Sequence, residues 1–198
     1  MIDDVLDSDF TYQLMNDAKD EIETMQDWAI LKTYDDYTVS SGYSYTSALD
    51  SLPSDFGQDI RVIETTGYTE YEKVAFDDLQ LQQNISFGYF LDLENDNLHL
   101  TGSNHTAKTV RFYYTKTSTD IAAATEWVFP SRFHSIIALK MAELYFATDA
   151  GEKSRSWDDR WAMQFERQLN RMYAWNDRLL SRNIRTRGVK DNPKGIMY

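Results

Sequence analysis

The sequence predicts an α+β protein, in which helices from both ends of the chain form a helical bundle that carries an inserted antiparallel β-domain. Two stretches, residues 6–29 and 157–182, have apolar residues at every third or fourth position, as on one face of an α-helix. From about residue 31 the pattern changes to the alternation that is typical of half-buried strands. Periodicity fades after Asn183, so we expect an extended C-terminal tail over residues 184–198.

One N-terminal helix is expected from the first of these stretches. Asp7, Ser8 or Asp9 can cap its first turn, where acidic side chains also complement the helix dipole. Nine acidic residues and a single basic one, Lys19, occur in the first thirty residues, so the outer face should be negative. The apolar stripe consists of Leu6, Phe10, Leu14, Ala18, Ile22, Met25 and Ala29.

Two long C-terminal helices are expected in residues 129–183. The first follows Pro130, a residue that favours a helix start, and apolar residues nearly surround it, so it should be buried on several sides. Together with the N-terminal helix, these helices form the predicted helical core, residues 1–30 and 128–183. The second helix has the clearest period of the chain, at Trp157, Trp161, Phe165, Leu169, Met172, Asn176 and Leu179.

Residues 31–127 are predicted to form the inserted β-domain. Apolar and polar residues alternate over 87–93 and again from residue 98, with a turn between them, which is a hairpin pattern. Residues 110–114 alternate in a further strong strand. Short strands are also expected at 60–62 and 72–76.

Charge is distributed unevenly along the chain, whose net charge is −12. Residues 1–150 hold nine Lys and Arg against twenty-six Asp and Glu, whereas residues 151–198 hold eleven against six. An acidic body disfavours binding to duplex DNA, which requires a basic face. A molecule with an acidic body and a basic end suits head-to-tail contacts between copies.

Composition limits the chemistry further. The chain has no cysteine, so disulfides, thiolate catalysis and zinc sites with sulfur ligands are excluded. No apolar run is long enough to span a membrane, and the acidic N-terminus does not resemble a signal peptide, so we expect no membrane partner and assembly in the cytoplasm. No nucleotide-binding or hydrolase motif occurs, and we expect neither enzymatic activity nor a cofactor.

Two possible metal sites have alternative explanations. His99 and His105 could bind a metal with Glu94 or Asp96, but their spacing matches no known motif. Asp92, Glu94 and Asp96 resemble the start of a calcium loop. That loop would need a glycine at its sixth position and a glutamate at its twelfth, and Asn97 and Ser103 stand there instead. We therefore favour an acidic hairpin turn, and we expect a structural role for His134.

Four fragments occur in order along the chain. The predicted N-terminal helix ends in QDWAIL, at residues 26–31, and the turn LPSDF follows at 52–56. The strand RFYY, at 111–114, precedes Pro130 and a helix that is rich in small residues, and a long helix with aromatic residues and a charged tail comes last. This arrangement resembles the head–tail connector, or adaptor, proteins of tailed bacteriophages over nearly the whole chain.

The resemblance implies a structural virion protein. Such proteins form a ring, commonly twelve-fold, that docks under the portal protein and links the capsid vertex to the tail. DNA passes through the lumen of the ring without sequence-specific binding, and further neck or tail proteins attach. The protein would lie in the neck of the virion and be assembled in the host cytoplasm.

The resemblance also implies which residues contact the portal. In connectors, the C-terminal helix and tail insert into the portal or lie along it. In this sequence the corresponding residues are Arg182, Asn183, Ile184, Arg185, Arg187 and Lys190.

An alternative function is a phage tail or baseplate module whose β-domain binds a glycan or another protein. Aromatic side chains in the β-region could stack on sugar rings, or they could instead pack the sheet or an oligomer interface. These aromatic residues are Tyr43, Tyr45, Tyr68, Tyr71 and Trp127.

Overall fold

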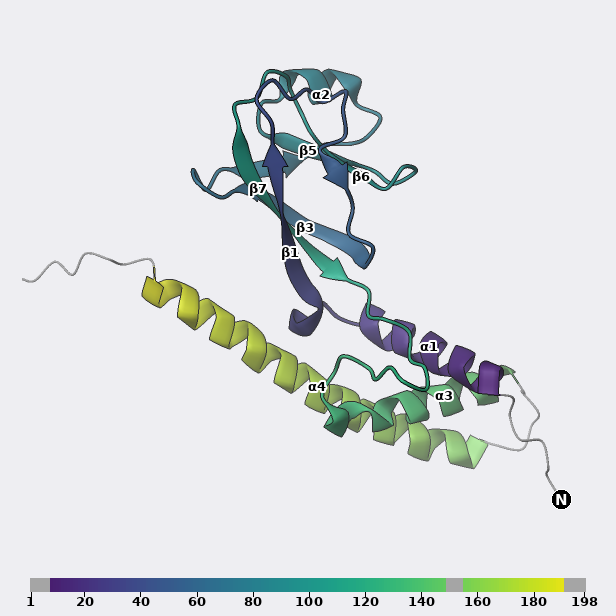
Figure 1. Cartoon of the computed structure of the whole chain (residues 1–198). Helices are drawn as coiled ribbons and strands as arrows, with labels where there is room; N and C mark the ends of the chain where they lie inside the picture. Colours follow the sequence, from purple (N-terminus) through teal and green to yellow (C-terminus); the bar gives the residue numbers. More distant parts are fainter. Residues whose placement is uncertain (1–7, 149–154, 191–198) are drawn as a thin grey trace, which may run out of the picture. The chain divides into compact units, whose positions relative to one another are not determined.

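The computed structural model describes residues 8–148 and 155–190 (Figure 1). The chain divides into two compact units. Met1–Ile30 and Ser118–Tyr198 form the helical unit, and Leu31–Thr117 form the β-unit. The domain boundaries expected from the sequence, with the β-domain at residues 31–127, stay a prediction.

The β-unit is a seven-stranded sheet with the strand order β1-β7-β3-β4-β5-β6-β2. Neighbouring strands are antiparallel except β4 and β5, which run parallel and are connected through the short helix α2, Leu79–Asn84. The strands are β1 Lys32–Val39, β2 Asp50–Ser51, β3 Phe56–Glu64, β4 Glu70–Lys73, β5 Gly88–Asp92, β6 Asn97–Leu100 and β7 Lys108–Lys116.

The sheet curls until its two edge strands approach each other, so it forms a nearly closed barrel. The hydroxyl of Tyr37 in β1 donates a hydrogen bond to the carbonyl oxygen of Ser51 in β2, at 3.4 Å. The alternation along β7 that the sequence predicts is present: Val110, Phe112 and Tyr114 are buried, while the residues between them are half-buried. The buried core of the barrel consists of Tyr37, Val39, Leu52, Val62, Tyr71, Tyr89, Leu91, Leu98, Leu100, Val110, Phe112 and Tyr114.

Tyrosine hydroxyls in this barrel should make the β-unit sensitive to alkali. Burial, together with the charges of Asp35 and Asp50, raises the pKa of Tyr37 to about 12. Burial also raises the pKa of Tyr89, beside Asp59. A tyrosine in an unfolded chain ionises near pH 10, so the unfolded state loses its proton first and the folded state loses stability as the pH rises from about 10 to about 12.

We expect Tyr37 alone to account for a loss of about 2 kcal/mol across this interval. A pKa difference of one between the two states corresponds to about 1.4 kcal/mol, and screening by solvent near the hydroxyl reduces the full value. Chemical denaturation at successive pH values, followed together with tyrosinate absorbance, measures the loss. The Tyr37→Phe variant keeps the ring but removes the ionisable group, so its stability should fall less steeply. Equal slopes for the variant and the parent chain would contradict this origin.

The helical unit contains three long or medium helices and two short 3-10 turns. α1 is Ser8–Thr24, α3 is Ser135–Thr148 and α4 is Arg155–Lys190, while the turns are η1, Ala29–Leu31, and η2, Ser131–Phe133. α3 packs against both α1 and α4 and lies between them (Figure 1). This position explains why apolar residues nearly surround α3 in the sequence, because a helix covered on two sides needs apolar residues on both.

An aromatic cluster around Trp28 joins the end of α1 to α4. Trp28 is fully buried, stacks on Tyr173 of α4 at a ring-centroid distance of 5.6 Å, and meets Phe129 edge-on at 5.2 Å. Its indole Nε1 donates a hydrogen bond to the carbonyl oxygen of Ile22, at 3.1 Å. Trp28 therefore holds the turn after α1 against the last helix.

Asn176 makes the second connection between these segments. It lies in the apolar stripe expected on the last helix and is fully buried. Its Oδ1 accepts a hydrogen bond from the backbone nitrogen of Ala29 at 2.7 Å, and its Nδ2 donates one to the carbonyl oxygen of Asp27 at 3.1 Å. The side-chain amide thus bonds two backbone groups of the turn after α1, which a purely apolar residue could not do.

The expected fold class, a helical bundle with two long C-terminal helices and an antiparallel β-domain, is wrong. The structure is organised around a seven-stranded, nearly closed, barrel-like sheet that includes a parallel pair, with four α-helices in the described residues. Only α4 is a long C-terminal helix, since α3 has 14 residues. In the helical unit α3 packs against α1 and against α4, so the three helices form a layer with α3 in the middle.

The expected extended tail is also wrong for residues 184–190, because α4 continues to Lys190. Gly188 lies inside this helix, where a glycine costs only about 1 kcal/mol relative to alanine and does not by itself end a helix. The first proline beyond the helix is Pro193. Residues 191–198 of the expected tail lie outside the described residues.

Candidate assembly surfaces

The end of α4 is strongly basic. The six residues expected to bind a portal, at positions 182–190, lie on its last helical turns rather than on an extended chain. From Arg178 to the helix end at Lys190 the sequence has five basic residues and no acidic one. At 1.5 Å per residue α4 is roughly 54 Å long and α3 roughly 21 Å, so much of α4 extends beyond its partner helix.

Four arginines form a row along α4 that the sequence analysis did not single out. They are spaced seven, four and seven residues apart, which places them within about 40° of one another around the helix at 100° per residue. All four are exposed, and none forms an ion pair with another residue in the described part of the chain. We call this row the arginine edge; it consists of Arg160, Arg167, Arg171 and Arg178.

A groove of about 400 Å³ runs beside the arginine edge, between α3 and α4. Ala138 and Leu139 of α3 and Trp161 of α4 supply apolar surface, and Arg167 and Arg171 border it from α4. An apolar groove that is bordered by exposed guanidinium groups suits a partner with an apolar anchor surrounded by carboxylates.

The outer face of α1 is acidic. Asp17, Asp20 and Glu21 are exposed there; Asp20 lies opposite to the buried Ala18 and Ile22, while Asp17 and Glu21 lie on the flanks between them. Asp20 also pairs with Lys19 at 3.0 Å, and Glu21 with Lys140 of α3 at 2.7 Å. Together with the exposed Phe10, these three residues form what we call the acidic edge.

A third face of α1 binds the segment 118–127, which we call the strap. Asn16 exchanges two hydrogen bonds with the backbone of Ile121, at 2.7 and 3.3 Å. Two turns further on, Glu23 accepts a hydrogen bond from Trp127 Nε1 at 2.7 Å. These contacts fix the strap along α1.

Lys19 completes this attachment from a buried position. Its Nζ donates to the carbonyl oxygen of Ser118 at 3.2 Å and pairs with Asp120 at 3.0 Å. Burial disfavours the charged amine, but the hydrogen bonds to Asp120 and Asp20 outweigh it and raise the pKa of Lys19. The side chain therefore stays charged at physiological pH.

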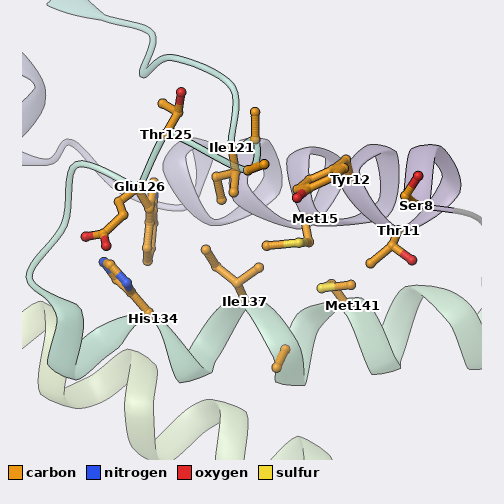
Figure 2. Close-up of a pocket in the computed structure, with 14 residues that line it drawn as sticks. Ser8, Thr11, Tyr12, Met15, Ile121, Thr125, Glu126, His134, Ile137 and Met141 are labelled. Atoms are coloured by element: carbon orange, nitrogen blue, oxygen red, sulfur yellow. The ribbon is translucent and has the colours of Figure 1, made fainter.

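The strap, α1 and α3 enclose a second groove, of about 570 Å³. Figure 2 shows Met15 of α1 and Met141 of α3 reaching into it together with Ile137. Glu126 of the strap and His134 approach each other at one end (Figure 2). The groove is mostly apolar, and nothing in its lining points to a reaction.

The outer face of the β-unit carries an ordered row of arginine and tyrosine side chains. Arg111 forms a bidentate ion pair with Asp36, at 2.7 and 2.8 Å, and lies over the ring of Tyr34. The hydrogen bond from Arg111 lowers the pKa of Asp36. Arg61 lies over the ring of Tyr113. Tyr34 is exposed and the other three side chains of the row are half-buried, and arginine and tyrosine are enriched in surfaces that bind other proteins.

The amino-acid sequence matches a known family over most of its length. A sequence model described as SU10 adaptor protein matches residues 1–188. The chain belongs to the SU10 adaptor family. A search of curated proteins found no match.

Membership in the SU10 adaptor family confirms the resemblance to phage head–tail adaptors. The chain is a phage adaptor protein of the virion neck, and it interacts with other head or tail proteins of the phage. The family is one of structural proteins. Among residues 8–148 and 155–190, no helix combines the length and the apolar composition that a membrane span requires.

The fragments that carried the resemblance have structural roles in this SU10 adaptor. Trp28 of QDWAIL is the centre of the aromatic cluster in the helical unit. In LPSDF, Leu52 is part of the barrel core, and Asp55 accepts a hydrogen bond from the Tyr114 hydroxyl at 3.0 Å. Tyr114 belongs to RFYY, so these two fragments contact each other directly.

The aromatic residues proposed for glycan stacking do not form a common surface. Tyr71 and Trp127 are buried, and Trp127 belongs to the helical unit rather than to the β-unit. Tyr43 is half-buried, and its hydroxyl is held by Ser47 and Leu100. Of the five, Tyr68 stands out with 82% of its surface exposed. The structure therefore supports the packing role for Tyr71 and Trp127 and a structural role for Tyr43, but not a packing role for Tyr68.

The proposed metal ligands are engaged in other contacts. His99 forms a hydrogen bond with the carbonyl oxygen of Tyr45 at 3.1 Å, and His105 with that of Thr101 at 2.7 Å. Asp92 accepts hydrogen bonds from the backbone and side chain of Asn95, which lower its pKa and stabilise the hairpin turn. No cluster of three or more possible ligands occurs in the described part of the chain.

His134 has the structural contact that the sequence analysis favoured. Its Nε2 donates a hydrogen bond to the carbonyl oxygen of Phe129 at 2.7 Å, and its ring lies beside Trp127. The side chain therefore stabilises the turn that leads into α3.

Proposed function

We propose that this SU10 adaptor forms a ring that docks on the portal protein, connects the capsid vertex to further neck or tail proteins, and passes DNA through its lumen. Family membership supports the adaptor role. The observation that carries portal docking is the basic end of α4, which extends beyond α3. In this proposal the docking residues are Arg182, Asn183, Ile184, Arg185, Arg187 and Lys190.

The helical state of this end favours docking. An extended tail would lose conformational entropy on binding, whereas a helix that is already formed presents its residues with a smaller loss. The five basic residues of positions 178–190, a stretch without an acidic residue, also favour contact with an acidic portal surface and increase the rate of encounter. The binding should therefore weaken as salt concentration rises.

The charge of the remaining chain supports a DNA conduit. The net charge is −12 although the C-terminal part is basic, so most of the body repels DNA phosphates. A negative lumen lets DNA slide without being retained. If neutral substitutions of the acidic residues that line an imaged lumen left DNA ejection unchanged, this part of the proposal would fall.

Portal binding is tested with three forms of the chain: full length, a truncation that ends at Asn183, and a variant in which four basic residues are replaced by glutamine. Light scattering and negative-stain imaging, each with and without the cognate portal, report complex formation. We expect the truncation to lose the complex and the glutamine variant to bind at least tenfold more weakly. The four substitutions are Arg182→Gln, Arg185→Gln, Arg187→Gln and Lys190→Gln.

Thermal unfolding of each form is the control for an intact fold. The contacts of Trp28 and Asn176 lie before the truncation point, so all three forms should melt alike. A truncation that still joins the portal as the full-length chain does would show that docking uses another surface.

A further inference from the structure

The helical unit has oppositely charged surfaces on its two outer helices. α3 lies between α1 and α4, so these helices form the two margins of one layer (Figure 1). The acidic edge lies on α1 and the arginine edge on α4. Within one copy α3 separates the two edges.

The arginine edge and the helix that carries the acidic edge match in length. From Arg160 to Arg178 the arginine edge extends over roughly 27 Å at 1.5 Å per residue, and α1 with its 17 residues is roughly 25 Å long. A helix of the length of α1 can therefore lie beside the whole row of arginines.

The two edges also match in chemistry. Phe10 exposes 44% of its surface at the first turn of α1, and the carboxylates of Asp17, Asp20 and Glu21, further along the helix, are exposed as well. Asp17 has no hydrogen bond or ion pair with a residue in the described part of the chain, and Asp20 keeps 65% of its side-chain surface exposed while it pairs with Lys19. On the other margin, α4 offers the exposed arginines, which form no ion pair with another described residue, and the apolar groove beside Trp161.

We propose that the acidic edge of one copy packs against the arginine edge of the next copy, with Phe10 in the groove between α3 and α4. This inference rests on the proposed function, since it names the contact between copies of the proposed ring. The contact joins two different surfaces, and such a heterologous contact closes into a ring when its rotation allows. Each copy would use its acidic edge on one side and its arginine edge on the other.

The ion pairs and the buried Phe10 contribute differently to the proposed contact. Exposed ion pairs each contribute little to affinity and are weakened by salt, so charge mainly sets the orientation and the rate of association. Burial of Phe10 in an apolar groove that the arginines shield from water supplies the central anchor. Phe10 and the carboxylates are therefore both needed.

Disulfide trapping tests the contact directly, because the chain has no cysteine of its own. Two single-cysteine chains, Asp17→Cys and Arg167→Cys, are mixed under mild oxidation, both alone at high concentration and assembled on the portal. A disulfide requires Cα atoms within about 7 Å. We expect the mixed dimer to form at least tenfold faster than either symmetric dimer.

Charge reversal supplies the second test. Arg167→Asp with Arg171→Asp makes both edges acidic, and Asp17→Arg with Asp20→Arg makes both edges basic. Each variant alone should self-associate at least tenfold more weakly than the parent chain, whereas an equimolar mixture should recover association by alternating the two. A variant that had merely lost its fold would not be rescued in this way, and thermal unfolding of each variant checks that point.

The outcomes separate this inference from portal docking. Rings on the portal without the mixed disulfide would overturn the inference and leave the proposed function intact. The mixed disulfide without portal binding would support the inference and overturn docking. If the arginine variant instead lost binding to duplex DNA and no mixed disulfide formed, the arginine edge would be a nucleic-acid surface and the inference would be wrong.

Discussion

Replacing Trp28 by alanine is expected to lower the free energy of unfolding of the helical unit by about 3–5 kcal/mol, the range for removing a large aromatic side chain from a core. The indole is fully buried between Phe129 and Tyr173. Its removal leaves a cavity between α4 and the turn after α1, and it also leaves the carbonyl oxygen of Ile22 without its indole donor. Urea denaturation followed by circular dichroism measures the change.

Tyr68→Ala is the matched control for this substitution. Tyr68 is also a large aromatic residue, but 82% of its surface is exposed, so its loss should change stability by less than about 0.5 kcal/mol. Similar effects of the two substitutions would show that Trp28 does not hold the helical unit together.

Replacing Asn176 is expected to have the second-largest effect. Asn176→Leu removes the side-chain hydrogen bonds to the backbone N–H of Ala29 and to the carbonyl oxygen of Asp27, both part-buried, at a cost of about 1–3 kcal/mol. In Asn176→Asp, a carboxylate can still accept from Ala29, but it is buried and faces the carbonyl oxygen of Asp27. Both variants should unfold at lower urea concentration than the parent chain.

Acid distinguishes the two variants. The buried carboxyl of Asn176→Asp should have a pKa above that of an unfolded aspartate, so its folded state binds the proton more readily and regains stability as the pH falls. A protonated carboxyl can also donate to Asp27 as the amide does. Asn176→Leu has no such group and should not recover. Asn170→Asp, at an exposed position of the same helix, is the control and should show little change.

The contacts of Asn176 show what the periodicity of apolar residues can predict and what it cannot. The three- and four-residue spacing correctly predicts that Met172 and Asn176 lie on the buried face of α4, because spacing depends only on helix geometry. It does not predict that Asn176 is buried as a hydrogen-bonding residue. That role depends on where the chain around Ala29 packs, which is a tertiary contact over 147 residues.

The sequence places the start of the β-domain at residue 31 but does not single out the strand β1, because two adjacent aspartates interrupt its apolar pattern. Asp36 lies on the outer face with Arg111, while Asp35 accepts a hydrogen bond from the buried Tyr114 at 3.2 Å. Both acids are therefore satisfied by partners on β7, which a local pattern does not show. The parallel pair β4 and β5 was missed for a similar reason, since α2 is short enough to resemble a turn.

Of the candidate surfaces, the basic end of α4 was visible in the sequence as a run of charge, but its helical state was not. The arginines of the arginine edge are spaced by seven and four residues, so their alignment on one side of a helix could be recognised from the sequence. Whether these arginines are available to a partner depends on the tertiary structure, because they could have formed ion pairs with acidic residues of neighbouring helices. The absence of ion pairs to other described residues singles them out.

The chain enters and leaves the β-unit through neighbouring strands. Lys32, at the start of β1, is paired with Thr115, near the end of β7. Paired residues of antiparallel strands lie about 5 Å apart, so the chain leaves the barrel close to the point where it enters it. The barrel therefore connects the two segments of the helical unit as a single long loop would. Because the entropy of closing a loop rises only slowly with its length, a lineage could lose, gain or exchange this barrel without redesigning the helices. Such an arrangement allows the two parts of a phage neck protein to evolve at different rates.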